Sequence, residues 1–298
     1  MSSYKGADII FPHLGIVIPK IRDHVTVFGF DIMFYGIIIG LGFIIGMLIV
    51  AADAKRRGQN PDDYWDMFIY VMIFGVLGAR LYYVAFSWDN YKNDLLQILN
   101  IRGGGLAIYG GIIGGTLAII IYCRIKKKSF LERLDSVVLG LWFGQALGRW
   151  GNFFNCEAFG EYTDTLLAMR MKESLVNPSA ITEKMKLHMI TDAGINYIQV
   201  HPTFLYESLW NLASLGIGLW YGRKVQKFKG EVFYLYLALY GIGRTWIEGL
   251  RTDSLYIAGT GLRVSQCLSA LLAVFGITMI LVKRKQLKNA EKTQKATE

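Results

Sequence analysis

The sequence predicts an all-α integral membrane protein with seven transmembrane helices and a small external head insertion. Of its 298 residues, 53% are hydrophobic and only 18% are charged, and the mean hydropathy is +0.34. A soluble domain of this size carries more charge. Several apolar runs also approach the roughly 20 residues that a helix needs to cross a bilayer. Basic residues gather after alternate runs, which is the pattern of a multi-pass chain.

The apolar runs define seven expected spans. The first is too long and starts too late to be a signal-peptide core, and no small-residue cleavage site follows it, so we expect a retained helix. The spans are 27–51, 65–86, 105–123, 135–154, 203–221, 231–249 and 263–282.

The net charge of +9 could suggest a nucleic-acid partner, but its distribution indicates topology instead. Each basic cluster follows an odd-numbered span, and the positive-inside rule places such clusters in the cytoplasm. We therefore expect the N-terminus outside and the C-terminus in the cytoplasm. The clusters are Lys55 to Arg57, Arg124 to Lys128, Arg223 to Lys229 and Lys283 to Lys288.

Three regions flank or interrupt the predicted membrane domain, which covers residues 27–282. Residues 1–26 hold an apolar stretch broken by Pro12, which suits an interfacial arm. Residues 155–200 form one long polar connection, which we expect to be the external head insertion. Residues 283–298 form a charged cytoplasmic tail that we expect to fray.

The stretch Gly148–Glu157 is the most informative part of the chain, because it places Arg149, Asn152 and Glu157 at the end of an apolar helix. Ionisable side chains at membrane depth cost about 2.5–3.5 kcal/mol each, so they are rarely without function. Glycines at every fourth position from 140 to 148 let a neighbouring helix come close. This combination predicts a polar site inside the bilayer.

The other unusual polar residues fall in the same outer half of the predicted spans. In the sixth span, Tyr240, Arg244, Glu248 and Arg251 share one helix face, since they lie at i, i+4, i+8 and i+11. An Arg–Glu pair that neutralises itself is the alternative interpretation of this face. The remaining outer residues are Tyr35, Arg80, Tyr109, His201 and Glu207, of which His201 could be a helix-entry residue and Glu207 a structural partner of an arginine.

Tyr109 lies between glycines that resemble a phosphate loop, but no Gly-Lys-Ser/Thr follows them. Gly110/Gly114 and Gly111/Gly115 are small-xxx-small pairs, so we interpret them as helix-packing positions. The Tyr109 hydroxyl needs a polar partner in lipid. The three cysteines predict no disulfide framework, and no Cys/His spacing indicates a metal site.

Four blocks together resemble one enzyme family. The pattern Gly148-Arg149-x-Gly-Asn152-Phe-x-Asn155-x-Glu157-x-x-Gly160 is similar to the signature of prolipoprotein diacylglyceryl transferases. The Tyr109-Gly-Gly block, the His201-Pro-x-x-Leu-Tyr206-Glu207 block and the Arg244-x-x-x-Glu248-x-x-Arg251 block follow the order of that family. The resemblance covers most of residues 30–282.

The resemblance implies a multi-pass enzyme of the bacterial plasma (inner) membrane. It would transfer a diacylglyceryl group from phosphatidylglycerol to the lipobox cysteine thiol of a preprolipoprotein, the first step of lipoprotein maturation, and release glycerol phosphate. It implies that Arg149 and Asn152 contact the lipid and that Arg244 is essential. We predict Arg244, Tyr109 and Glu248 as catalytic residues and, as lipid-binding residues, Arg149, Asn152, Glu157, Gly160, Tyr35, Tyr240 and Arg251.

Tyr109 departs from the family pattern, because the best-known members have a histidine there that has been discussed as the base. A tyrosine with a pKa near 10 is a poor base at neutral pH, so we favour a positioning role. The base remains open among Tyr109, His201, Glu248 and none. Arginines grip phosphate in bidentate fashion, and a positive site lowers the thiol pKa, so we expect no metal or organic cofactor.

An outer-leaflet anionic-lipid flippase or transporter is the alternative function. It predicts polar groups along the whole membrane depth and broken helices in matching halves. Here the polar residues stop at the outer half of the spans, and no inverted repeat is visible. An acyltransferase would need a Ser/His or His/Asp constellation, and none stands out.

Overall fold

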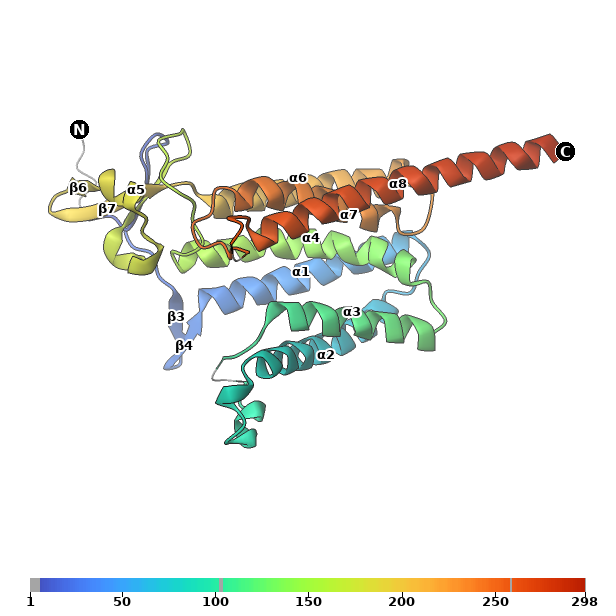
Figure 1. Cartoon of the computed structure of the whole chain (residues 1–298), viewed down its shortest axis with the longest axis horizontal. Helices are drawn as coiled ribbons and strands as arrows, with labels where there is room; N and C mark the ends of the chain where they lie inside the picture. Colours follow the sequence, from blue (N-terminus) through green and yellow to red (C-terminus); the bar gives the residue numbers. More distant parts are fainter. Residues whose placement is uncertain (1–5, 102–103, 258, 298) are drawn as a thin grey trace. The chain divides into compact units, whose positions relative to one another are not determined.

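The computed structural model describes residues 6–101, 104–257 and 259–297, and most of the chain is helical (Figure 1). Within these described residues, four helices are long and apolar enough to cross a membrane: α1 (Phe34–Arg56), α2 (Asp62–Phe86), α3 (Ile108–Ile125) and α8 (Val264–Thr297). Three more have comparable lengths but carry more polar residues: α4 (Phe130–Phe154), α6 (Thr203–Lys224) and α7 (Glu231–Glu248). This helical content is consistent with an integral membrane protein.

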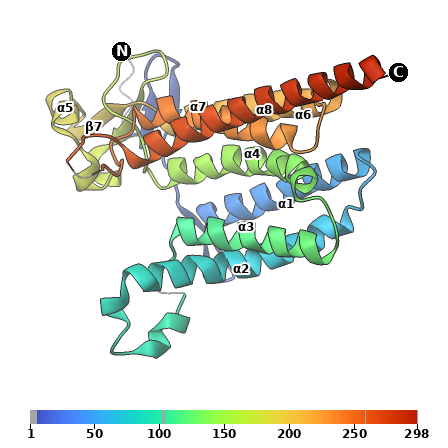
Figure 2. The ribbon, with the colours of Figure 1, turned by 45° about the vertical axis from the view of Figure 1, so that its right-hand side comes forward.

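The chain forms two compact units, Met1–Gly46 with Val138–Glu298, and Met47–Val137. In the first unit, α7 packs against α6 and α8, and the three helices run side by side in both ribbon views (Figures 1 and 2). The middle of α1 lies against α4, where a Cβ added to Gly46 would be 3.0 Å from the carbonyl oxygen of Gly140. The predicted close approach is therefore confirmed at Gly140, whereas a Cβ on Gly148 would meet nothing within 4 Å.

A five-stranded antiparallel sheet in the first unit departs from the all-α prediction. Its order is β2–β1–β5–β7–β6, with β1 (Ile9–Phe11), β2 (Ile16–Ile18), β5 (Met169–Lys172), β6 (Ile190–Asp192) and β7 (Ile195–Val200). The N-terminal segment, expected as an interfacial arm, adds β1 and β2 to strands of the head insertion through the pair Ile9↔Met171. Met169 and Met171 are buried and alternate with Arg170 and Lys172, which is the period-two pattern of a half-buried strand. The short helix α5 (Glu183–Leu187) contributes Met185 to the same buried apolar cluster as Met169 and Met171.

Two further segments differ from the prediction. The hairpin β3 (His24–Val27) and β4 (Phe30–Met33) occupies the start of the expected first span, so α1 begins at Phe34. Phe28 and Gly29 both have positive φ, as the tight hairpin turn requires. At the other end, α8 continues as a helix through the charged residues expected to fray, because this stretch is rich in Lys, Ala and Gln, which are strong helix formers.

The second unit is built around the packing of α2 against α3. A Cβ on Gly110 would collide with the backbone of Gly78, so the helix-packing interpretation of these glycines is confirmed. Next to them, the buried Arg80 donates hydrogen bonds to backbone carbonyls in the connection between the two helices. The acceptors are Gln97, Ile98, Asn100, Gly104 and Gly105, at 2.6–3.0 Å.

Candidate functional site

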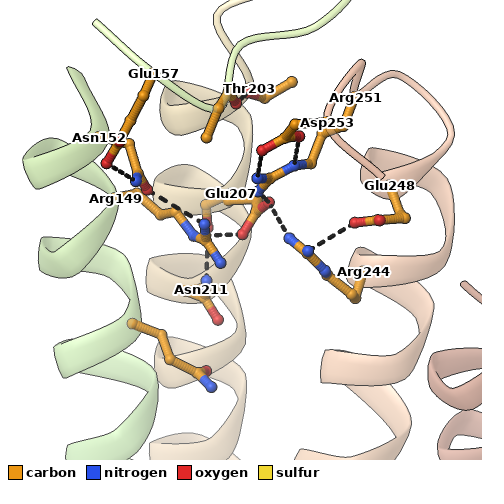
Figure 3. A network of polar contacts seen from close by, with 12 residues as sticks. Arg149, Asn152, Glu157, Thr203, Glu207, Asn211, Arg244, Glu248, Arg251 and Asp253 are labelled. Atoms are coloured by element: carbon orange, nitrogen blue, oxygen red, sulfur yellow. Dashed lines mark hydrogen bonds and ion pairs between the residues drawn. The ribbon is translucent and has the colours of Figure 1, made fainter. Parts of the chain in front are cut away.

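Three helices of the first unit bring the predicted polar residues together (Figure 3). Arg149 lies near the end of α4, Glu207 in the second turn of α6, and Arg244 in the last turns of α7. Arg251 follows the end of α7 directly. The site therefore forms where these helices meet the head, because α4 leads into the head and α6 leaves it.

Glu207 is the centre of the cluster. One carboxylate oxygen, Oε2, lies 2.5 Å from Nε of Arg149, and the other, Oε1, lies 2.7 Å from Nη1 of Arg244. Nη1 of Arg251 is 3.7 Å from Oε1. The Glu207 side chain is only 7% exposed, so one buried carboxylate joins three arginines from different segments. Such a charge is tolerated because its partners compensate the cost of desolvation.

Arg244 and Arg251 each pair with a second carboxylate. Nη2 of Arg244 pairs with Oε2 of Glu248 at 2.6 Å, one helical turn further along α7. Arg251 forms a two-point pair with Asp253, with Nε to Oδ1 at 2.9 Å and Nη2 to Oδ2 at 2.6 Å. The three arginines thus face three carboxylates. Burial alone would raise the pKa of Asp253, but the hydrogen bonds and charge of Arg251 outweigh it and hold this pKa below its usual value.

The turn after α4 positions Asn152 and Glu157. Nη1 of Arg149 lies 3.3 Å from Oδ1 of Asn152, and Nδ2 of Asn152 donates to Oε1 of Glu157 at 3.0 Å. The Glu157 backbone N–H also donates to the Asn152 carbonyl, while Cys156 adopts the left-handed conformation that ends the helix. Burial raises the pKa of the Cys156 thiol to about 11, which makes this cysteine a core residue and a poor nucleophile.

Gly160, Tyr35 and Tyr240 surround the cluster in different ways. Gly160 links the head to the segments next to α6 and α7. Its N–H donates a hydrogen bond to the carbonyl of His201, just before α6, and it forms a β-bridge with Arg251, just after α7. A Cβ there would be 2.8 Å from Cβ of His201. Tyr35, on α1, packs against α4 where a Cβ on Gly151 would collide with its ring. Tyr240 lies one helical turn before Arg244, and its ring stacks on the ring of Tyr236 with 5.8 Å between the ring centroids.

Tyr109 belongs to the second unit, in the first turn of α3, whereas the arginine cluster belongs to the first unit. Its side chain is 42% exposed. His201, the other aromatic candidate for a base, lies in the first unit with Nδ1 3.3 Å from the Tyr206 hydroxyl. Burial, with a smaller contribution from Lys184, lowers the pKa of His201, so its ring is neutral at neutral pH. Within the described part of the chain, no group of three or more His, Cys, Asp or Glu side chains is placed to hold a metal ion.

Glu207 and Asp253 are not among the residues predicted for the site. The sequence predicts Glu207 only as a structural partner of an arginine, and the structure confirms its pairing with Arg149 and Arg244. The need to balance the charge of the arginines could have indicated both carboxylates from the sequence. Three buried arginines need several carboxylates, and Asp253 lies only two residues after Arg251.

The arrangement suits the binding of an anionic phosphodiester. Three guanidinium groups offer planar pairs of N–H donors that match phosphate oxygens. They are largely buried, with side chains 28%, 15% and 11% exposed for Arg149, Arg244 and Arg251. Screening by water is therefore weak and electrostatic stabilisation of developing negative charge is strong.

Comparisons with known proteins agree with these features. A family model described as prolipoprotein diacylglyceryl transferase matches residues 23–282. The chain is 42% identical over 264 residues to the phosphatidylglycerol–prolipoprotein diacylglyceryl transferase of Clostridioides difficile, covering 89% of this chain and 96% of that one. It is 40% identical over 262 residues to the protein of the same name from Finegoldia magna, covering 88% and 95% of the two chains. Because the family match covers most of the chain, including every residue of the arginine cluster, the chain belongs to the prolipoprotein diacylglyceryl transferase family.

Proposed function

We propose that this protein transfers the diacylglyceryl group of phosphatidylglycerol to the lipobox cysteine thiol of preprolipoproteins. The observation that carries the proposal is the convergence of Arg149, Arg244 and Arg251 on the single buried carboxylate of Glu207. A phosphodiester can take the place of a carboxylate among these arginines, because both present paired anionic oxygens to a guanidinium fork. The relatives carry both substrates in their names.

The reaction breaks one C–O bond and forms one C–S bond. The thiolate attacks the glycerol carbon that carries the phosphate ester, and the bonding electrons leave with the phosphate oxygen. The phosphate then bears a second negative charge, so cations placed around it stabilise the transition state more than the bound lipid. In this proposal Arg244 and Arg149 hold the phosphate, Glu248 orients Arg244, and Asn152 orients Arg149 with the support of Glu157.

The thiol proton requires only a weak acceptor. A thiol with a reference pKa near 8.5 ionises more readily next to an arginine side chain. The proton can pass to water, or to His201, which is neutral and carries a free acceptor nitrogen in one of its tautomers. Tyr35 and Tyr240, in the same unit as the cluster, help to position the lipid, and Tyr109 stays a predicted positioning residue. Arg251 contacts the phosphate, and Gly160 keeps the turn that carries Glu157 close to the two helices.

The proposed location is the bacterial inner membrane, crossed seven times. The helices α4, α6 and α7 cross it together with the four most apolar ones, and their charged residues are those of the site and of the helix ends. By the positive-inside rule, the basic clusters support a cytoplasmic C-terminus and an external head that carries the arginine cluster. The polar site lies at the head ends of the helices, which favours a transferase over the alternative of a flippase or transporter.

A purified-enzyme assay tests the function. Detergent-purified protein is mixed with phosphatidylglycerol and a lipobox peptide, and mass spectrometry measures a thioether-linked diacylglyceryl adduct together with released glycerol phosphate. Arg244→Gln should abolish the adduct, and Arg284→Gln, which removes an arginine paired with Glu231 at the opposite end of α7, is the matched control. Absence of the adduct with folded wild-type protein would exclude the proposed transfer.

A further inference from the structure

The three carboxylates that neutralise the arginine cluster differ in their access to water. The Glu207 and Glu248 side chains are 7% and 2% exposed and belong to α6 and α7. The Asp253 side chain is 43% exposed and lies on the connection between α7 and α8. Of the three, Asp253 is the carboxylate that can turn toward water without leaving its own charge buried and unpaired.

Asp253 also holds Arg251 in the geometry that a phosphate would use. Its two oxygens accept from Nε and Nη2 of Arg251 at 2.9 Å and 2.6 Å, which is a bidentate fork-to-fork pair. The Arg251 side chain is 11% exposed, and its remaining Nη1 faces Glu207 at 3.7 Å. The same pair of donors cannot serve a carboxylate and a phosphate at once, so a lipid that uses this fork must displace Asp253.

The charges favour this exchange. The resting cluster is neutral, because Arg149, Arg244 and Arg251 face Glu207, Glu248 and Asp253. A phosphodiester that replaces Asp253 keeps the cluster neutral, since one negative charge leaves and one enters. After transfer the glycerol phosphate carries up to two negative charges, and the cluster then holds one negative charge in excess. Repulsion of the product and return of Asp253 both follow from that excess.

We propose that Asp253 is an exchangeable counter-ion: it occupies the Arg251 fork in the empty enzyme, yields the fork to the lipid phosphate, and takes it back as glycerol phosphate leaves. The proposal rests on the proposed diacylglyceryl transfer. It makes Asp253 a positioning residue, because it acts through Arg251 and is absent from the fork while substrate is bound.

The test compares anion binding in matched variants of the detergent-purified protein. Asp253→Asn and Asp253→Ser both remove the competing charge. Asp89→Asn is the control, because Asp89 is an exposed aspartate paired with Lys92 at 2.7 Å in the other unit. Isothermal titration calorimetry measures the dissociation constant of glycerol phosphate. Steady-state kinetics measures KM for phosphatidylglycerol and the inhibition constant of glycerol phosphate.

If Asp253 occupies the fork about nine-tenths of the time, its removal should tighten glycerol phosphate binding about tenfold, because the apparent affinity scales with the competent fraction. KM and the inhibition constant should fall by a similar factor in both Asp253 variants, kcat should not rise, and Asp89→Asn should match the wild type. Unchanged or weaker glycerol phosphate binding in both Asp253 variants, whatever their thermal stability, would overturn the proposal. A wild-type protein that binds glycerol phosphate but forms no adduct would instead contradict the proposed function, and the binding comparison would still decide the role of Asp253.

Discussion

Replacing Arg149 with lysine should separate the geometry of this side chain from its charge. Nε of Arg149 contacts Oε2 of Glu207 at 2.5 Å, while Nη1 reaches Oδ1 of Asn152 at 3.3 Å. A guanidinium makes both contacts and still presents N–H groups to a phosphate. A lysine ammonium is a single point, so it can keep the pair with Glu207 but loses the second contact or the phosphate.

The expected loss follows from one charge-assisted hydrogen bond, which contributes about 1.5–3 kcal/mol. At about 1.36 kcal/mol for each factor of ten, Arg149→Lys should lower kcat/KM roughly ten- to hundredfold or more. The assay is the rate of adduct formation from phosphatidylglycerol vesicles and a lipobox peptide. Membrane insertion and thermal stability should stay close to the wild type, because the buried charge remains paired.

Arg284→Lys is the matched control for this variant. Arg284 pairs with Glu231 at 2.5 Å, and Glu231 precedes Arg244 by 13 positions on α7, a separation of about 20 Å along the helix. This variant should transfer at nearly the wild-type rate. Near-normal kcat/KM in Arg149→Lys would refute the reasoning and make Arg149 a structural residue, whereas equal losses in both variants would point to a general effect of arginine removal on folding.

Four more outcomes are expected. Phosphatidylethanolamine should not donate, because its headgroup brings an ammonium beside the three arginines; equal turnover from both lipids would contradict the proposed site. Cysteines introduced between 160 and 195 should react with a membrane-impermeant thiol reagent in intact cells and those at 224–229 should not, and the reverse pattern would invert the proposed topology. Tyr109→Phe should cost about 0.5–1.5 kcal/mol with an unchanged pH profile, as for an ordinary lost hydrogen bond. A Tyr109→His variant that gains a pH limb near 6–7 would instead indicate a proton acceptor. Gly160→Ala should lower thermal stability by about 1–3 kcal/mol because its Cβ would be 2.9 Å from the Leu250 carbonyl oxygen, while Gly144→Ala, with nothing within 4 Å of its Cβ, should not.

The sequence was most informative where one helix carries the pattern. The face of Tyr240, Arg244, Glu248 and Arg251 could be predicted from spacing alone, and the Arg244–Glu248 pair is present at 2.6 Å. Its alternative interpretation, a self-neutralising pair, describes only part of the arrangement, because Arg244 also binds Glu207 on another helix. Such contacts between helices depend on how the helices pack, and the periodicity within one helix does not predict that packing.

The head was harder to predict because its strands are short and come from distant segments. Residues 169–172 alternate between buried and half-buried side chains, but four residues are too few to distinguish a strand from a loop. The pairing of β1 with β5 joins residues 9 and 10 to residues 171 and 170, far away in the chain. Nothing local to either segment specifies that partner. The apolar N-terminal stretch predicts burial, but the sequence does not distinguish burial at a membrane surface from burial in a sheet.

The length of α8 gives the protein a rigid extension. Its 34 residues span about 51 Å, well beyond the hydrocarbon thickness of about 30 Å. Arg284 fixes the helix where it passes Glu231 and Tyr221, through Nε and Nη2 contacts of 2.5 Å and 2.9 Å. The 13 residues that follow, up to Thr297, project about 20 Å further as a basic rod. A fluorescent probe or affinity tag joined after this helix would be held at that distance from the helix bundle and would report its orientation without disturbing the polar site.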